Sequence, residues 1–184
     1  MTLVLGMTGP NAAGKGEVSG ILAEHGFVTH SLSDVVREEA AARGLPPERE
    51  HLIQVGTRLR REGGAGVLAQ RLLPRIGTRD VVDSIRNPAE VAVLRGVPGF
   101  VLVGIQAPPR LRFERSRLRA RGGDPETFDA FLARERQENS SDPAGQQLAA
   151  TFALADHVIP NDGDLEALRS RVEELLASLG RGGA

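Results

Sequence analysis

The chain contains no cysteine, so disulfide bonds and thiolate metal sites are excluded. It also lacks a long apolar run, because its longest one, residues 99–107, is far too short to cross a bilayer. An excess of one charge is missing as well: 23 Lys and Arg stand against 24 Asp and Glu, which gives a formal net charge of -1. Without an overall basic field or an apolar span, we expect neither nucleic acid nor a membrane as the main partner.

The four histidines show no metal-ligand spacing, and we interpret all of them as structural. Met1 leads directly into a predicted strand without a signal-peptide pattern, so the cytoplasm is the expected location. The length of 184 residues suits one well-cored domain. We expect that domain to cover residues 1–179, followed by a flexible Gly-rich tail at residues 180–184.

Lysine is nearly absent, and its single occurrence is informative. Every basic residue except Lys15 is arginine, and Lys15 lies in the segment Gly-Pro-Asn-Ala-Ala-Gly-Lys-Gly, residues 9–16. This segment stands between an apolar run and a helical pattern, which is the layout of a strand, a phosphate-binding loop and a helix N-terminus. An ammonium is compact enough to fit between β- and γ-phosphate oxygens, whereas a guanidinium is a wide planar fork. The predicted nucleotide-binding loop consists of Gly9, Asn11, Ala12, Ala13, Gly14, Lys15, Gly16 and Glu17.

The loop departs from the commonest phosphate-loop pattern in its metal chemistry. Gly16 stands where Ser or Thr would place a hydroxyl on Mg²⁺, so the metal must be held through water, by Glu17 or by another acid. Asp83 is the next candidate, because it ends an apolar strand and would face the loop across the sheet. Helix capping is the alternative interpretation of Asp83. We predict that Asp83 organises Mg²⁺.

Periodicity and turn residues predict a doubly wound α/β fold with a parallel sheet. Short apolar runs predict strands at residues 2–7, 27–30, 80–83, 100–106 and 156–159. Helices are expected at residues 15–25, 34–43, 47–61, 67–76, 88–94, 109–121, 125–137, 143–153 and 164–179. Four prolines are expected at or near the first turn of a helix: Pro88, Pro109, Pro125 and Pro143. Ligands of such a fold bind at the carboxyl ends of the strands.

Arginines follow the second and third predicted strands. Arg37 and Arg86 would both lie over the carboxyl edge of the sheet, where two guanidinium forks suit the phosphate of an acceptor. In the alternative interpretation Arg37 pairs with a neighbouring glutamate on a solvated helix and Arg86 flanks a turn. Arg58 is a further candidate for the acceptor site, although a solvated surface position explains it equally well.

A denser arginine cluster occupies the helix predicted at residues 109–121. Helical spacing places Arg112, Arg115 and Arg119 on one face. With Gly122 and Gly123 as a hinge, this segment could close as a lid over a phosphoryl group in transfer. The alternative is a solvated basic face balanced by nearby glutamates. We predict that Arg115 and Arg119 are catalytic.

With these residues in view, the chain resembles the nucleoside monophosphate kinase group of P-loop proteins, particularly relatives of dephospho-CoA kinase and adenylate kinase. The resemblance runs from residue 1 to about residue 176. Its matching stretches are residues 9–16, 32–39, 82–86, 112–115 and 155–163. Adenylate kinases follow Gly-Lys-Gly with Thr, where this chain has Glu17.

The resemblance implies a three-layer fold with a five-stranded parallel sheet and helical acceptor-binding and lid segments. It also implies ATP and Mg²⁺ as cofactors, with Asn161, Asp162 or Gly163 near the adenine. Asp34 would contact the acceptor or its attacking oxygen, although helix capping explains it about as well.

The predicted function is transfer of the γ-phosphoryl group of ATP to a nucleoside or deoxynucleoside monophosphate. The acceptor is thus a small nucleotide-like molecule, and the oligomeric state stays open. Dephospho-CoA kinase is the first alternative, but residues 31–34 lack the acidic pair expected of that enzyme. A nucleotide-binding regulatory ATPase is the second alternative, motivated by Gly16 and Glu17.

Overall fold

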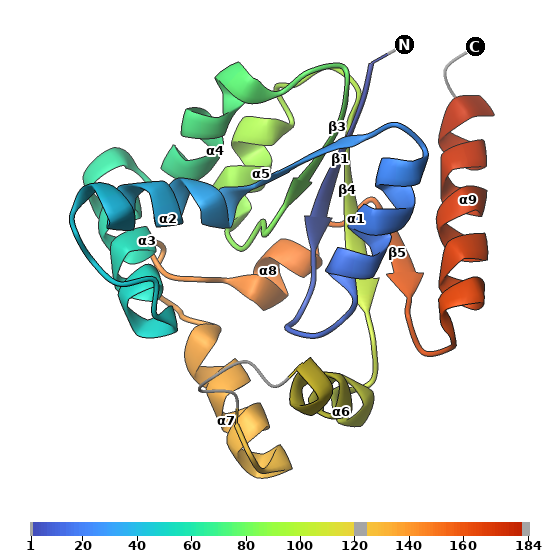
Figure 1. Cartoon of the computed structure of the whole chain (residues 1–184). Helices are drawn as coiled ribbons and strands as arrows, with labels where there is room; N and C mark the ends of the chain where they lie inside the picture. Colours follow the sequence, from blue (N-terminus) through green and yellow to red (C-terminus); the bar gives the residue numbers. More distant parts are fainter. Residues whose placement is uncertain (1, 120–124, 182–184) are drawn as a thin grey trace.

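The computed structural model describes residues 2–119 and 125–181. Its centre is a five-stranded parallel sheet in the order β2-β3-β1-β4-β5 (Figure 1). The strands are β1 (Leu3–Thr8), β2 (Val28–Ser31), β3 (Arg79–Asp83), β4 (Phe100–Gln106) and β5 (His157–Pro160). Each predicted strand is therefore present within about one residue of its expected bounds.

Helices cover both faces of the sheet. One face carries α1 (Lys15–Glu24) and α9 (Leu165–Arg181), and the other carries α2 (Leu32–Ala42), α3 (Arg49–Gly63), α4 (Val67–Leu72), α5 (Pro88–Leu94) and α8 (Leu148–Phe152). Neighbouring residues of one strand serve opposite layers: Val4 and Val82 pack with the α2 side, whereas Leu5 and Val81 pack with the α1 side. The three-layer doubly wound fold predicted from the sequence is confirmed.

Two further helices lie beyond the carboxyl ends of the strands, at the bottom of Figure 1. They are α6 (Pro109–Arg119) and α7 (Phe128–Glu138), and α6 contacts α7. The predicted hinge, Gly122 and Gly123, lies outside the described residues. The site is therefore enclosed by the sheet edge, by α2 and α3 on one side and by α6 and α7 below.

Two of the proline predictions are confirmed and two are wrong. Pro88 and Pro109 are the first residues of α5 and α6. Pro125 is not a helix start, because Thr127 caps α7 by accepting a hydrogen bond from the Ala130 N–H at 3.2 Å. Pro143 also precedes its helix by several residues, since Asn87 holds this segment in an irregular form with Nδ2 hydrogen bonds to the Pro143 and Gly145 carbonyls.

Smaller differences concern helix ends. The helix predicted at residues 67–76 is α4 followed by the 3₁₀ turn Leu73–Arg75 at Pro74. The last helix, α9, continues through Arg181 into the segment predicted as tail, and residues 182–184 lie outside the described part. No helix in residues 2–119 and 125–181 is both long and apolar enough to span a membrane.

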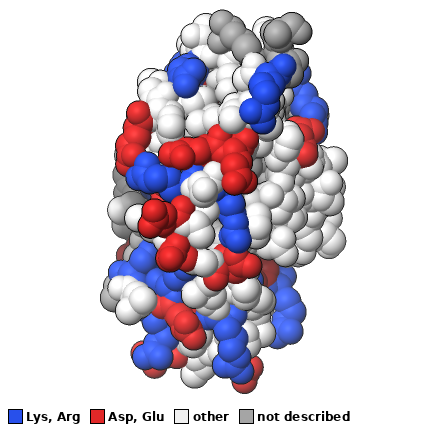
Figure 2. All heavy atoms as spheres, turned by 90° about the vertical axis from the view of Figure 1, so that its right-hand side faces the viewer, with Lys and Arg blue, Asp and Glu red and all other residues white. Residues whose placement is uncertain are grey.

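Charges of both signs are mixed over the face that carries α9. Figure 2 shows Lys and Arg side chains interspersed with Asp and Glu there, without a continuous basic area. Two of the pairs involve α9: Arg169 with Glu24 and Arg171 with Asp162. On this face, the mixture accords with the nearly neutral net charge of the chain.

Candidate functional site

The backbone of the Gly-rich loop between β1 and α1 adopts conformations that favour glycine. Gly9, Ala12 and Gly14 have positive φ angles of 141°, 57° and 102°. A β-carbon on Gly9 would lie 2.3 Å from the Ile105 carbonyl oxygen, so β4 leaves room for glycine only. The loop ends at Lys15, the first residue of α1, where free backbone N–H groups and the helix dipole favour an anion.

Asn161, which directly follows β5, supports this loop from the other side. Its Nδ2 donates a 2.8 Å hydrogen bond to the Ala13 carbonyl, and its backbone N–H donates to Gln106. A β-carbon on Gly14 would lie only 2.0 Å from the same Nδ2. Asn161 is 4% exposed, so it acts here as a buried support of the loop. Gly163 is exposed and does not contribute to the clefts described below.

Lys15 lines a cleft of about 660 Å³, which we call the loop cleft. Its ammonium donates to the Gly9 and Pro10 carbonyl oxygens at 2.9 and 3.1 Å. Burial lowers the pKa of Lys15 from 10.5 to about 8; Asp83 opposes this shift, whereas Arg86 and Arg119 add to it. The ammonium is therefore short of negative charge, which the oxygens of a phosphate would supply.

Besides Arg37, which pairs with Asp34, three further arginines line the loop cleft together with Lys15: Arg86, Arg115 and Arg119. Among the described residues, none of the three has a carboxylate within ion-pair distance. Arg86 donates to Gln146 Oε1 at 2.8 Å, and Arg115 donates to the Asn161 carbonyl at 3.1 Å. Burial also lowers the pKa of Arg86. Uncompensated guanidinium groups around a buried ammonium form a site for a strongly anionic ligand.

Asp83 has a carboxylate oxygen that could bind a divalent metal ion. Its Oδ1 is buried and has no hydrogen-bond partner within the described part of the chain, and Asp83 lines the loop cleft. No cluster of three or more His, Cys, Asp or Glu side chains suited to a metal exists among the described residues. Mg²⁺ is commonly bound by one or two carboxylates, phosphate oxygens and water, so one free carboxylate oxygen beside a phosphate cradle fits this ion.

A second cleft of about 500 Å³ adjoins the first, between α2, α3 and the loop after β3. We call it the side cleft. Its wall includes the apolar side chains of Leu32, Val36, Leu52, Ile53 and Leu68. Five residues line both clefts: Asn11, Ser33, Arg37, Ser84 and Arg86. A ligand in the side cleft would therefore meet a ligand in the loop cleft at these residues.

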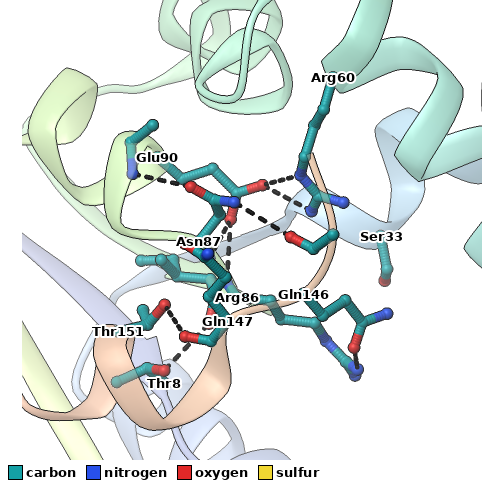
Figure 3. Close-up of polar contacts among 12 residues, drawn as sticks. Thr8, Ser33, Arg60, Arg86, Asn87, Glu90, Gln146, Gln147 and Thr151 are labelled. Carbon is teal, nitrogen blue, oxygen red and sulfur yellow. Dashed lines mark hydrogen bonds and ion pairs between the residues drawn. The ribbon is translucent and has the colours of Figure 1, made fainter. Parts of the chain in front are cut away.

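A buried ion pair fixes the position of Arg86. Glu90, fully buried at the start of α5, accepts hydrogen bonds from Arg60 Nε and Nη2 at 3.0 and 2.7 Å. Its other oxygen accepts from the backbone N–H groups of Arg86 and Asn87 at 2.9 and 3.1 Å. Figure 3 shows Glu90 between Arg60 and this backbone, while the Arg86 side chain extends toward Gln146. Glu90 thus fixes the backbone of Arg86 on the side away from its guanidinium group.

A second bridge joins the loop to α3 and α7. Glu138, at the end of α7, accepts two hydrogen bonds from Arg49 Nη2 at 2.6 and 2.8 Å and one from Asn11 Nδ2 at 3.3 Å. Arg112 strengthens the same region: it is buried, pairs with Glu135 and donates to the Asn11 carbonyl at 3.3 Å. All three arginines predicted on one face of α6 therefore point toward the loop.

The structure does not bring every predicted residue into the clefts. Arg58 is exposed and pairs with Glu62 one turn further along α3, so it lines neither cleft. Arg60, two residues on, takes the inward position. Asp34 is also exposed and lines neither cleft, but it holds Arg37 with a 2.6 Å ion pair. Arg37 therefore pairs with Asp34 instead of a glutamate and still lines both clefts.

Sequence reasoning missed the residues whose role depends on distant partners: Arg49, Arg60, Ser84, Glu90, Glu138 and Gln146. One signal was available for Glu90, because Asn87-Pro88-Ala89-Glu90 is a capping-box pattern. Another was available for Arg60, which follows Val55, Gly56 and Leu59 at helical spacing on the buried face of α3. Nothing local marks Glu138 as a partner of the loop.

Comparison of the sequence with curated proteins finds relatives along nearly the whole chain. A UPF0200 protein of Hyperthermus butylicus is 38% identical over 181 residues, covering 96% of this chain and 93% of the relative. A UPF0200 protein of Pyrococcus horikoshii is 33% identical over 186 residues, covering 96% of both chains. The chain belongs to the UPF0200 family. A scan of protein-family models gives no match.

Solved structures resemble the fold over its full length. Shikimate kinase from Bacteroides thetaiotaomicron superimposes with a TM-score of 0.63 at 13% identity, covering 98% of this chain and 99% of that one. Shikimate kinase from Acinetobacter baumannii, in complex with shikimate, gives a TM-score of 0.61 at 16% identity, covering 100% and 96%. This UPF0200 member therefore has the fold of the P-loop kinases.

Proposed function

We propose that the protein is a kinase that transfers the γ-phosphoryl group of ATP to a nucleoside or deoxynucleoside monophosphate. The observation that carries this proposal is the convergence of Lys15, Arg86, Arg115 and Arg119 on one cleft without a carboxylate partner for the three guanidiniums among the described residues. Such a concentration of positive charge suits a triphosphate and the charge that spreads over a phosphoryl group in transfer.

The two clefts divide the reaction between them. The loop cleft would hold the triphosphate on the backbone N–H groups of residues 9–16, with Lys15 at the β- and γ-phosphates. The side cleft would hold the acceptor, with Arg86 and Arg37 at its phosphate and aliphatic side chains beside its nucleoside. Because Arg86 lines both clefts, it would hold the attacking oxygen near the γ-phosphorus, and such positioning is the main source of catalysis in phosphoryl transfer.

Arg115 and Arg119 would act by electrostatic stabilisation and not by transferring protons. Both come from the same helix face and line the loop cleft together with Arg86. They would stabilise the equatorial oxygens of the phosphoryl group as it moves, and α6 would exclude water from them. Mg²⁺ would be held through Asp83 and would neutralise part of the phosphate charge.

A coupled ADP-release assay with ATP and Mg²⁺ tests this proposal. The acceptor panel contains the nucleoside and deoxynucleoside monophosphates, dephospho-CoA and shikimate. We expect turnover with one or more monophosphates, loss of turnover in Lys15→Ala, and a rise of roughly tenfold or more in acceptor KM in Arg86→Ala, the loss of one charged hydrogen bond. Arg169→Ala, which removes a surface ion pair with Glu24, serves as the matched arginine control.

Three outcomes would contradict the proposal. Turnover with dephospho-CoA or shikimate alone would assign another acceptor. Equal ATP turnover in the wild type and in Lys15→Ala would remove Lys15 from the reaction. ATP hydrolysis that no small acceptor stimulates would favour a regulatory ATPase.

A further inference from the structure

Ser84 has a backbone conformation that serine rarely adopts. Its φ angle is 65°, and among the described residues only Ala12, in the phosphate loop, is another non-glycine residue with positive φ. Ser84 directly follows Asp83 at the end of β3 and lines both clefts. Glycine would adopt this conformation without steric cost. A serine at this position therefore indicates that its side chain has a function.

The Ser84 hydroxyl ends a chain of hydrogen bonds that starts at Arg37. Arg37 Nη1 donates to Ser33 Oγ at 2.9 Å. Ser33 Oγ lies 2.8 Å from Ser31 Oγ, and Ser31 Oγ donates to Ser84 Oγ at 3.1 Å. The chain thus connects a cation in the middle of α2 with a hydroxyl directly after β3.

The direction of this chain follows from the number of hydrogens. A guanidinium can only donate, and each hydroxyl has one hydrogen to donate. Since Ser31 gives its hydrogen to Ser84, Ser33 must give its own to Ser31. The Ser84 hydrogen then has no acceptor within the described part of the chain, and it belongs to a side chain that lines both clefts.

We propose that Ser84 Oγ donates a hydrogen bond to the phosphoryl group as it passes between the clefts; this inference rests on the proposed kinase function. Arg37, which also pairs with Asp34, donates the first hydrogen bond of the chain, and each hydroxyl that accepts a hydrogen bond becomes a better donor to the next, which strengthens the terminal donor. A donor aimed at developing charge accelerates phosphoryl transfer more than it strengthens ATP binding.

Two variants of Ser84 separate the hydroxyl from the backbone. Ser84→Ala removes the hydroxyl and keeps the strained backbone, whereas Ser84→Gly removes the hydroxyl and relieves the strain. We expect kcat for phosphoryl transfer to fall by roughly 10-fold to 100-fold in both, with KM for ATP changed little. The midpoint of thermal unfolding should be higher in Ser84→Gly than in Ser84→Ala. Ser33→Ala, which interrupts the chain upstream, should give a smaller loss of kcat.

A binding measurement makes the test independent of the acceptor. ADP, Mg²⁺ and fluoroaluminate form an analogue of the phosphoryl group in transfer, and its affinity should fall in both Ser84 variants by about the same factor as kcat. The affinity for ADP and Mg²⁺ alone should not change. Ser178→Ala, which removes a hydroxyl that donates to Leu175 on α9, is the matched control and should leave both affinities unchanged.

The outcomes distinguish this inference from the function on which it rests. If the wild type binds the analogue and both Ser84 variants bind it equally well, the hydroxyl has no such role and the kinase proposal stands. Ser84→Gly with at least wild-type kcat would likewise overturn the inference. If the wild type neither binds the analogue nor transfers phosphate to any acceptor in the panel, both proposals fail.

Discussion

At the scale of single residues, Lys15 lowers the stability of the folded chain but suits the binding of an anionic ligand. The folded chain keeps its ammonium in partly buried surroundings near Arg86 and Arg119, and burial lowers its pKa to about 8. A ligand with several negative charges would relieve this situation. The free protein is therefore less stable than it would be with a neutral side chain at this position.

The pH dependence of stability tests this effect of Lys15. In the unfolded chain the pKa of Lys15 is 10.5, and in the folded chain it is about 8. Between these values the unfolded chain binds more protons, so the free energy of unfolding rises with pH across this window. Lys15→Met should be more stable than the wild type at pH 7, by on the order of 1 to 3 kcal/mol, and this advantage should shrink toward pH 10. Urea unfolding without ligands at pH 7, 8, 9 and 10 measures it; a constant difference would contradict the prediction.

At this scale the sequence could predict the residues whose position in the loop cleft follows from local spacing. Lys15, Arg115 and Arg119 could be found because their loop or helix spacing determines where they point. Ser84 could not be found, because the role proposed for it depends on a φ angle and on three residues from another segment. Arg58 and Arg60 show the limit: both follow from the same basic run, and only the packing of α3 decides which of them faces inward.

At the scale of elements, α3 and α5 are joined by the buried pair of Arg60 and Glu90. Both side chains are almost completely buried. Glu90 also accepts hydrogen bonds from the two backbone N–H groups that precede α5. Removing one partner of such a pair leaves an uncompensated charge in the interior. This pair therefore maintains the wall of the side cleft as well as the position of Arg86.

Removal of Glu90 should be far more damaging than removal of a surface carboxylate from α3. We expect Glu90→Ala to lower the free energy of unfolding by about 3 to 5 kcal/mol, since Arg60 stays buried without its partner. Glu62→Ala removes the exposed partner of Arg58 and should cost about 0 to 1 kcal/mol. Denaturant unfolding of the two variants in parallel measures both values. Similar losses in the two variants would mean that Arg60 finds another partner or reaches solvent.

The bounds of helices and strands could be predicted where a local sequence signal marks them. The predicted bounds were wrong where a distant side chain determines the local structure. The strands follow from short apolar runs, and the start of α5 follows from Pro88 in its first turn. The start of α8 depends on Asn87, which lies more than fifty residues away and binds the carbonyls of residues 143 and 145. No pattern within residues 143–153 reveals this interaction.

For the whole molecule, Glu138 connects the two clefts. It is bonded to Asn11 in the loop and to Arg49 in the wall of the side cleft, and Arg49 belongs to a different layer from α1. A ligand that fixes Asn11 would therefore also restrict Arg49. Two ligands bound together should favour the same arrangement of Glu138, which is the condition for mutual strengthening of their binding.

A probe that occupies both clefts tests this connection. Diadenosine pentaphosphate carries two nucleosides and should bind the wild type more tightly than ATP does. In Glu138→Gln its affinity should fall by roughly 5-fold to 50-fold more than the affinity for ATP, the range of ordinary coupling between sites. Titration calorimetry with both ligands measures the two changes. Asp142→Asn, which alters another pair between α3 and the segment after α7, is the control, and equal losses in both variants would contradict the prediction.

The hydrogen bond from Asn161 to the Ala13 carbonyl has one more consequence. Asn161 directly follows β5, so the pairing of β5 with β4 also fixes the shape of the Gly-rich loop, and a ligand of this loop would leave it little conformational freedom to lose on binding. Any side chain placed at position 14 would displace the Asn161 amide, and with it the carbonyl that Arg115 holds. A mutation in this N-terminal loop would therefore displace residues after β5 and in α6 together.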